Sequence, residues 1–180
     1  MIPFLVILAL VVIVAVTIYN RMVTLRNRVD NAWAQIDVQL KKRNDLVPNL
    51  VETVKGYVKH ERETFESITK ARAQMASAGS VGEQAQASNM LSGALKSLFA
   101  VAEAYPELKA NQNFLMLQEE LSGIESKIAY ARQFYNDSVL AWNAAIQQFP
   151  GVIFAGMMGA APKEYFHTPE AEKAVPTVKF

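Results

Sequence analysis

The residues best suited to chemistry in this sequence are its two histidines and 17 aspartates and glutamates, because it contains no cysteine. Without cysteine there is no thiolate nucleophile, disulfide or iron–sulfur ligand. A di-iron helical bundle needs two Glu-x-x-His motifs on separate helices, and only Glu164 and His167 have this spacing. Glu119 and Glu120 are adjacent, so on a helix they point about 100° apart. We therefore expect no catalytic residues and no metal or cofactor site.

Two further charged groups are interpreted as solvated surface. His60 could pair with a neighbouring glutamate, but it lies in a run of mixed charge that typically faces water. The basic cluster at residues 41–43 suggests lipid or nucleic acid, yet Asp37 and Asp45 are spaced for local helix pairs with its lysines. A net charge of +1 and a pI of about 7.9 also argue against nucleic acid as a partner.

The first twenty residues predict a membrane anchor. Residues 2–19 carry no charge and read IPFLVILALVVIVAVTIY. As a helix they are about 27 Å long, close to the ~30 Å of a hydrocarbon core. A cleaved signal peptide is the alternative, but the basic residue before the apolar run and the small residues after it are missing. Arg21, Arg26 and Arg28 follow the run, so the positive-inside rule places the N-terminus outside and the body in the cytoplasm.

The rest of the sequence reads as helix. Apolar residues recur every three or four positions within residues 25–40, 47–75, 91–105 and 114–149. We expect Pro48 to kink or restart the first helix, with Asn44 or Asp45 as the cap. Residues 77–83, with two glycines and two serines, are expected to form a loop.

These elements predict an all-α fold. Residues 1–20 form a transmembrane anchor that continues into an antiparallel bundle of about four long helices over residues 21–150, and an apolar loop and C-terminal tail follow over residues 151–180. The regular heptads of the last helix are typical of bundles and coiled coils. The residues that we expect to anchor the core, the assembly and the helix geometry are Trp33, Ile36, Leu40, Pro48, Phe114, Tyr135 and Trp142. The apolar positions of such heptads form a seam between packed helices. Four polar residues at or near this seam either fix the helix register or face water: Asn31, Asn136, Ser138 and Asn143.

The segment at residues 150–162 is uncharged but, at 13 residues, too short to span a bilayer. It could dip into the membrane interface, tuck under the bundle or mediate self-association. We favour tucking or self-association, because glycine and proline suit an interfacial helix poorly.

Charge is unevenly distributed along the chain. Residues 20–75 carry 11 lysines and arginines against 7 acidic residues, whereas residues 76–180 carry 7 against 10. The two halves should attract each other, which favours packing within one bundle or assembly between copies.

The sequence also resembles a known family. Residues 25–72, which read LRNRVDNAWAQIDVQLKKRNDLVPNLVETVKGYVKHERETFESITKAR, closely resemble the LemA family of bacterial membrane proteins. The similarity continues through AYPELKAN at residues 104–111 and reaches Phe149-Pro150 and Tyr165-Phe166. The resemblance implies one N-terminal transmembrane helix and a cytoplasmic helical bundle at the bacterial inner membrane. It implies no catalytic activity.

Three hypotheses for function follow. The first is a non-enzymatic, membrane-anchored scaffold that self-associates into a homo-oligomer, with the lipid bilayer as its other partner. The second is an adaptor or regulator of a membrane protease or transporter, with residues 52–72 as the docking surface. The third is a metal-dependent hydrolase built on the glutamates and histidines.

Overall fold

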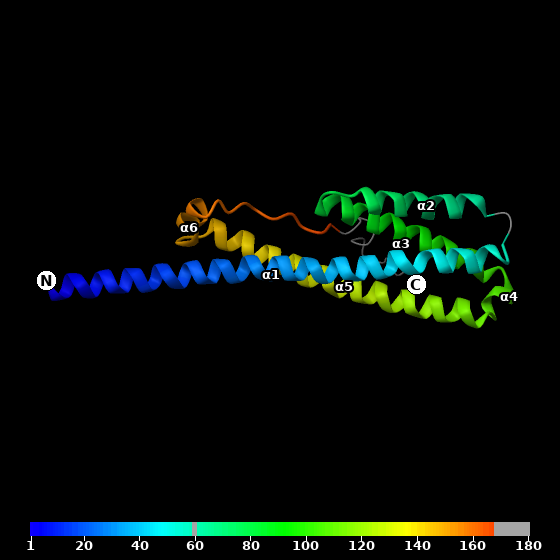
Figure 1. Ribbon diagram of the computed structural model, residues 1–180, viewed down its shortest axis with the longest axis horizontal. Coiled ribbons are helices and arrows are strands. Elements are labelled where there is room, and N and C mark those ends of the chain that lie inside the picture. The colour runs from blue at the N-terminus through cyan, green and yellow to red at the C-terminus, as the bar shows by residue number, and fades with distance from the viewer. Residues whose placement is uncertain (59–60, 168–180) are drawn as a thin grey trace, which may run out of the picture. The chain divides into compact units, whose positions relative to one another are not determined.

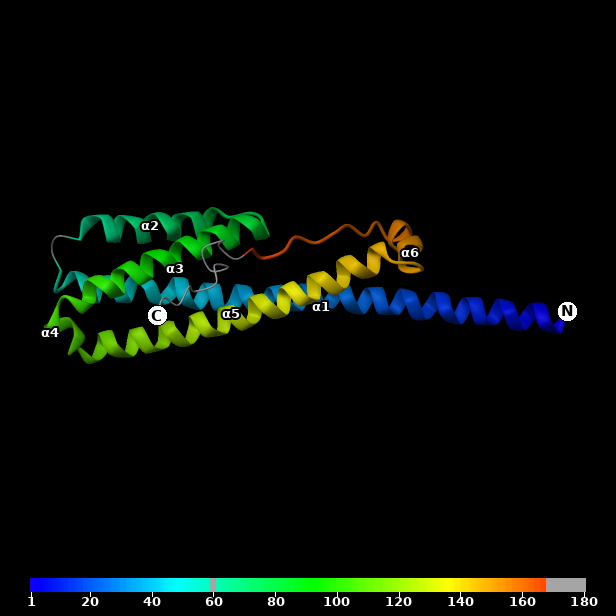
Figure 2. The ribbon, with the colours of Figure 1, turned by 180° about the vertical axis from the view of Figure 1, so that it is seen from behind.

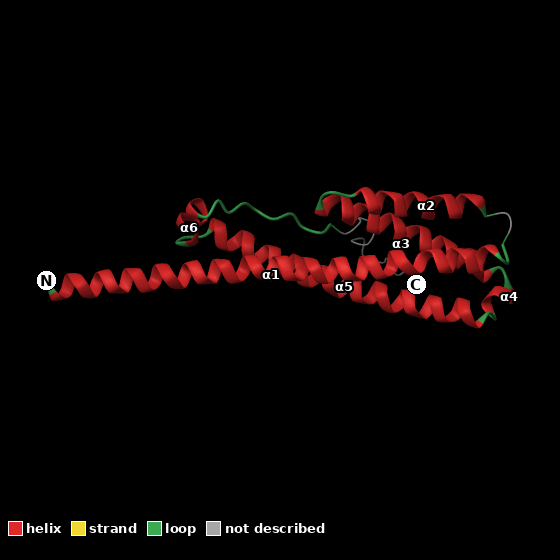
Figure 3. Ribbon diagram, viewed as in Figure 1, coloured by secondary structure: helices red, strands yellow, loops and turns green. Residues whose placement is uncertain are grey.

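The computed structural model describes residues 1–58 and 61–167, and within these residues every regular element is a helix (Figures 1 and 3). The helices are α1 (Ile2–Lys55), α2 (Arg62–Ser77), α3 (Val81–Glu103), α4 (Pro106–Lys109), α5 (Gln112–Gln147) and α6 (Gly151–Met157). The predicted all-α fold, with a long apolar N-terminal helix followed by helices that pack together, is confirmed.

Helix α1 continues through Pro48, so the predicted restart at Asn44 or Asp45 is wrong. A proline inside a helix costs about 3 kcal/mol, because it removes one backbone hydrogen bond and crowds the preceding turn. Val47 and Leu50, on either side of the proline, are fully buried, and burial of such side chains contributes about 1.5–3 kcal/mol each. Tertiary packing therefore outweighs the local penalty. Asn44 has a different partner, since its Oδ1 accepts a hydrogen bond from Arg72 Nε of α2 at 3.2 Å.

The connection between α2 and α3 comprises residues 78–80 rather than the expected 77–83. It is short because Ser80 begins a capping box: its Oγ accepts a hydrogen bond from the Glu83 N–H at 3.2 Å. In return, the Glu83 carboxylate accepts bonds from the backbone N–H groups of Gly79 at 2.7 Å and Ser80 at 3.1 Å. These backbone bonds, that of Gly79 first, favour the ionised form and lower the pKa of Glu83.

The chain divides into two compact units. Unit 1 comprises residues 1–36 and 131–164, and unit 2 comprises residues 37–130 and 165–180. Helices α1 and α5 each contribute residues to both units.

In unit 2, side chains from α1 to α5 form an apolar core, and α2 lies beside α3. Its largest buried aliphatic and aromatic members are Leu50, Ile68, Leu91, Leu98, Leu108, Phe114 and Leu121.

In unit 1, the N-terminal part of α1 and the C-terminal half of α5 run in opposite directions (Figures 1 and 2). Residues 1–14 of α1 are all exposed. The buried residues that these two helices contribute to this unit include Met22, Val29, Ala32, Ile36, Tyr135, Val139, Trp142 and Ile146.

A buried arginine lies within unit 2. The side chain of Arg43 in α1 is 0% exposed, and its Nη1 lies 2.8 Å from Glu125 Oε1 in α5. The same guanidinium donates to the hydroxyls of Ser92 and Ser88 in α3, each at 2.9 Å. Because arginine stays protonated at any physiological pH, these partners are what make its burial tolerable. One side chain thus joins α1, α3 and α5.

We predict that the two ends of this ion pair respond differently to mutation. Glu125→Ala leaves a fully buried guanidinium without its counter-charge and should cost about 3 kcal/mol or more of unfolding free energy. Arg43→Met leaves Glu125, whose side chain is 38% exposed, in contact with water, and should cost no more than about 1 kcal/mol. Urea denaturation of the full chain in mild detergent, followed by circular dichroism, measures both.

The double variant Arg43→Met/Glu125→Ala should be more stable than Glu125→Ala alone, because it removes the stranded charge. Glu120→Ala, at an exposed position on the same helix, is the control and should change little. A double variant no more stable than Glu125→Ala would contradict this account.

A second prediction concerns pH and the capping box. Because the pKa of Glu83 is lowered from its ordinary value of 4.5, the stability that its carboxylate contributes is complete above that value and is lost as pH falls through the lower folded-state value. The wild type should therefore exceed Glu83→Gln in unfolding free energy at neutral pH, and the difference should shrink as the solution is acidified below about 4.5. Denaturation curves at a series of pH values measure this difference, and a pH-independent one would refute the assignment.

Candidate functional site

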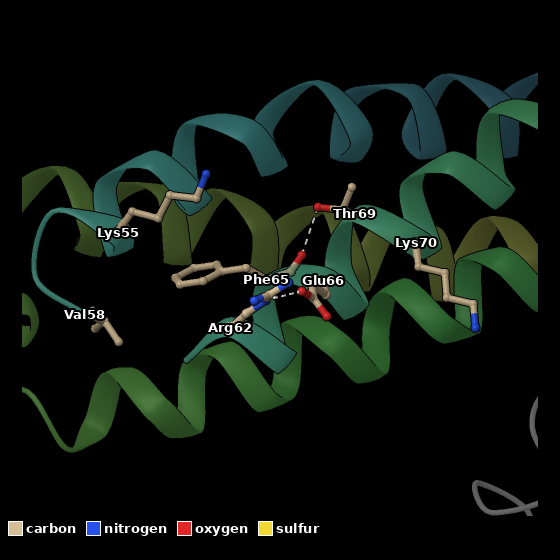
Figure 4. Close-up of a pocket in the computed structure, with 7 residues that line it drawn as sticks. All are labelled: Lys55, Val58, Arg62, Phe65, Glu66, Thr69 and Lys70. Carbon is tan, nitrogen blue, oxygen red and sulfur yellow. Dashed lines mark hydrogen bonds and ion pairs between the residues drawn. The ribbon is translucent and has the colours of Figure 1, made fainter. Parts of the chain in front are cut away.

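The candidate site in unit 2 is a groove of about 700 Å³ where α1 ends and α2 begins. Figure 4 shows the residues that line it: Lys55, Val58, Arg62, Phe65, Glu66, Thr69 and Lys70. The α2 members recur at intervals of three and four residues, so one face of that helix forms most of the wall. Lys59 and His60, in the connection between the helices, lie outside the described residues.

The apolar part of the groove is supplied by Val58, which is buried, and Phe65, which is half-buried. In Figure 4 the Phe65 ring points toward the end of the groove where Lys55 and Val58 lie, and Lys70 stands at the other end. The Lys55 ammonium lies 5.9 Å from the centroid of the Phe65 ring, within the range of a cation–π interaction.

The charged part of the groove is predominantly basic. Its lining has three cationic side chains and one carboxylate, that of Glu66. Arg62 Nε contacts Glu66 Oε1 at 2.5 Å, and Lys55 Nζ contacts Glu52 Oε1 at 2.9 Å. Both pairs are exposed and local, and such pairs contribute only about 0.2–1 kcal/mol. Lys55 and Arg62 can therefore exchange these carboxylate partners for the anionic groups of a ligand at little cost in free energy.

The chemistry of this groove suits binding. An aromatic ring and an aliphatic side chain between lysines and an arginine match a segment that carries both apolar and acidic side chains. Across the part of the chain that the structure describes, no three His, Asp or Glu side chains gather closely enough to hold a metal ion.

Unit 1 contains three of the residues that the sequence predicted as anchors, two of which are in contact. The rings of Trp33 and Tyr135 lie 5.4 Å apart, and Trp142 is buried. The Tyr135 hydroxyl donates to the Glu164 carbonyl at 2.9 Å, and Trp142 Nε1 donates to the Ala161 carbonyl at 3.0 Å. Burial, followed by the charges of Glu164 and Asp30, raises the pKa of Tyr135 to about 12. The Tyr135 hydroxyl therefore remains a donor. The side chains of Tyr135 and Trp142 together hold the segment that follows α6.

The four polar residues near the predicted seam have different surroundings. Ser138 is buried and donates to the Phe134 carbonyl at 2.7 Å. Asn143 exchanges two hydrogen bonds with the backbone of Lys163, at 2.8 and 3.0 Å. Asn31 is exposed, and Asn136 is half-buried. Asn143 thus positions the same C-terminal segment as Tyr135 and Trp142.

The other predicted anchors divide between the two units. Ile36 of unit 1 is buried, as are Leu40 and Phe114 of unit 2, and Pro48 is half-buried within α1. Phe114 makes an edge contact with Phe99, with ring centroids 6.3 Å apart.

The three arginines that follow the apolar run are exposed. Arg21 and Arg26 belong to the part of α1 in unit 1, and the Arg28 guanidinium lies 5.1 Å over the ring of Phe134.

The residue that sequence reasoning missed is Arg43. The sequence assigned it to a basic surface cluster, but only Lys41 and Lys42 are exposed. A signal was present: Leu40 and Val47 lie three residues before and four residues after Arg43, so the arginine occupies a core position of the helical repeat.

Of the two histidines, only His167 is described, and it does not line the groove. His167 is exposed, and its carbonyl accepts a hydrogen bond from Asn89 Nδ2 at 3.2 Å. His60 and the tail at residues 168–180 lie outside the described residues.

Comparison with known proteins places the chain in a family. The LemA family model matches residues 32–180. Magnetosome protein MamQ of Magnetospirillum gryphiswaldense is 24% identical over 83% of this chain and 64% of its own length. Protein LemA of Metamycoplasma hominis is 28% identical over 72% of this chain and 60% of its own length. The chain thus spans less than two thirds of these relatives. Because the family model covers more than half of the chain, the protein belongs to the LemA family.

Proposed function

We propose that this protein is a non-enzymatic scaffold tethered to the bacterial inner membrane by α1. The observation that best supports this proposal is that α1 is one continuous helix with an exposed apolar first part and a packed second part. Its N-terminal segment has a window of mean hydropathy 3.0, long and apolar enough to cross a membrane, and none of that window is buried. Its remaining length contributes buried residues to both units.

The orientation in this proposal follows from the charges beside the span. Arg21, Arg26 and Arg28 are exposed in the first turns after the apolar run. Lysine and arginine near the end of a span favour the cytoplasmic side. The N-terminus then faces outward, and the residues that follow the apolar run lie on the cytoplasmic side.

Self-association is the second part of the proposal. Several large apolar side chains of α5 are exposed, notably Tyr130, Phe134 and Leu140. Exposed aromatic and aliphatic side chains on one helix are typical of surfaces that bind other proteins. The opposite net charges of the two halves of the sequence favour contacts between copies.

We predict discrete homo-oligomers of the full chain in native membranes. Cross-linking in membranes, followed by electrophoresis, should give a ladder that ends at one size. Phe134→Ser with Leu140→Ser should reduce this ladder, because it removes apolar surface, whereas Ser122→Ala with Ser126→Ala, at exposed positions on the same helix, should not. A strictly monomeric protein at cellular concentration would refute the assembly.

The groove supports a second candidate, an adaptor that captures an acidic segment of a membrane protein. A photo-cross-linking residue at Thr69, which lines the groove and is exposed, should label a protein other than this chain. The same residue at Ser97, exposed on α3, is the control. Equal labelling at both positions, or labelling of further copies alone, would eliminate the adaptor.

A further inference from the structure

Helix α6 reverses the usual pattern of a surface helix. Its buried residues are the small Gly151 and Ala155, whereas the large Ile153 and Met157 are 54% and 81% exposed. Phe149, just before the helix, is 81% exposed. No charged residue occurs between positions 150 and 162. The outward face is therefore entirely apolar, which water alone does not favour.

The orientation of α6 is fixed by close packing on the end of α5. A Cβ added to Gly151 would lie 2.1 Å from the carbonyl oxygen of Ala145, so only glycine permits this approach. Two residues before α6, Phe149 projects into solvent. With Gly151 and Ala155 packed inward, the large side chains of Ile153 and Met157 lie on the outward face.

Contacts within unit 1 give the level of α6 along α1. Arg28 lies over Phe134, and α5 runs 13 residues further to Gln147, in the direction opposite to α1. At about 1.5 Å per residue, these 13 residues of α5 are ~20 Å long. The same length along α1, measured from Arg28 toward the N-terminus, ends at about residue 15. Figures 1 and 2 show α6 at the end of unit 1 from which the N-terminal part of α1 projects.

Burial along α1 agrees with this level. Residues 1–14 are exposed, Ala15 and Ile18 are half-buried, and Met22 is fully buried. The cover that the rest of unit 1 gives to α1 therefore begins at about the last turn of the uncharged run, residues 2–19.

From these observations we propose that α6 and Phe149 insert into the interfacial layer of the same bilayer that α1 enters. The proposal rests on the membrane-spanning role of α1 given above. When residues 2–19 cross the hydrocarbon, α6 lies at the boundary between the headgroups and the acyl chains, and Phe149, Ile153 and Met157 contact the acyl chains. Arg21, exposed near the same level, is available to anionic headgroups.

Lipid fits this face better than a second copy of the chain. A protein interface of ordinary size has a polar rim with hydrogen bonds around its apolar centre, whereas residues 150–162 provide no charged side chain for such a rim. Glycine and proline were expected to suit an interfacial helix poorly. In the structure, however, Gly151 permits close packing of α6 on α5, and both prolines lie outside the helix.

The natural absence of cysteine allows a direct test. Single cysteines replace Ile153, Met157, Leu8 or Gln133 in the full chain, and each carries a nitrobenzoxadiazole fluorophore. The proteins are reconstituted in vesicles of phosphatidylethanolamine and phosphatidylglycerol, with nitroxide quenchers placed shallow or deep in the acyl chains. Gln133 is the matched control, because it is exposed on the α5 part of unit 1 but near the level of Arg28.

For labels at Ile153 and Met157, we expect the fluorescence emission to shift to the blue and to be quenched by the shallow nitroxide. The Leu8 label should be quenched by the deep nitroxide, and the Gln133 label by neither. Quenching at Leu8 without quenching at Ile153 or Met157 overturns the interfacial helix and leaves the anchor intact. A blue shift at Ile153 and Met157 without quenching means that the apolar face of α6 is covered by protein rather than lipid, and it also overturns the interfacial helix. Absence of quenching at Leu8 refutes the anchor itself.

Discussion

Burial of one permanent positive charge constrains the whole of unit 2. Arginine side chains are positively charged at physiological pH, so the burial of Arg43 requires acceptors at fixed positions: the carboxylate of Glu125 and the hydroxyls of Ser88 and Ser92. These acceptors come from α3 and α5, whereas the arginine comes from α1. Apolar side chains tolerate small slips of one helix along another, but a guanidinium with three partners does not. The polar contacts of Arg43 thus link α1, α3 and α5 at one relative position, within a surrounding aliphatic core.

The groove depends on the same scaffold. Its α1 residue, Lys55, lies three turns beyond Arg43 on one continuous helix, and α2 is held to α1 by the bond from Arg72 to Asn44. The groove combines an apolar floor with weakly paired cations, an arrangement for holding a ligand. The proposed tethered binding surface rests on this groove and on the exposed apolar segment of α1.

Much of the fold could be predicted from the sequence because it depends on short-range patterns. The heptads that predicted the last helix correspond to α5, and the uncharged run predicted the apolar start of α1. The errors arose where tertiary packing outweighed local preference. Pro48 is tolerated because its neighbours are buried. Residues 151–157, expected as a loop, form a short helix whose first residue, Gly151, packs closely against the Ala145 carbonyl. Arg43 and the groove combine residues from helices distant in sequence, and periodicity alone does not show which helices meet.

The interleaved composition of the two units has a consequence for biosynthesis. Unit 1 needs both residues 1–36 and residues 131–164, so its first part leaves the ribosome 95 positions before its partner begins. At the usual 5–20 residues per second this delay is about 5–20 s. Throughout that time Met22, Val29 and Ile36, which end up buried, have no α5 to cover them. The nascent chain must keep this stripe from aggregating, and a membrane surface already engaged by the N-terminal run, or a chaperone, is what can shield it until the last long helix is complete.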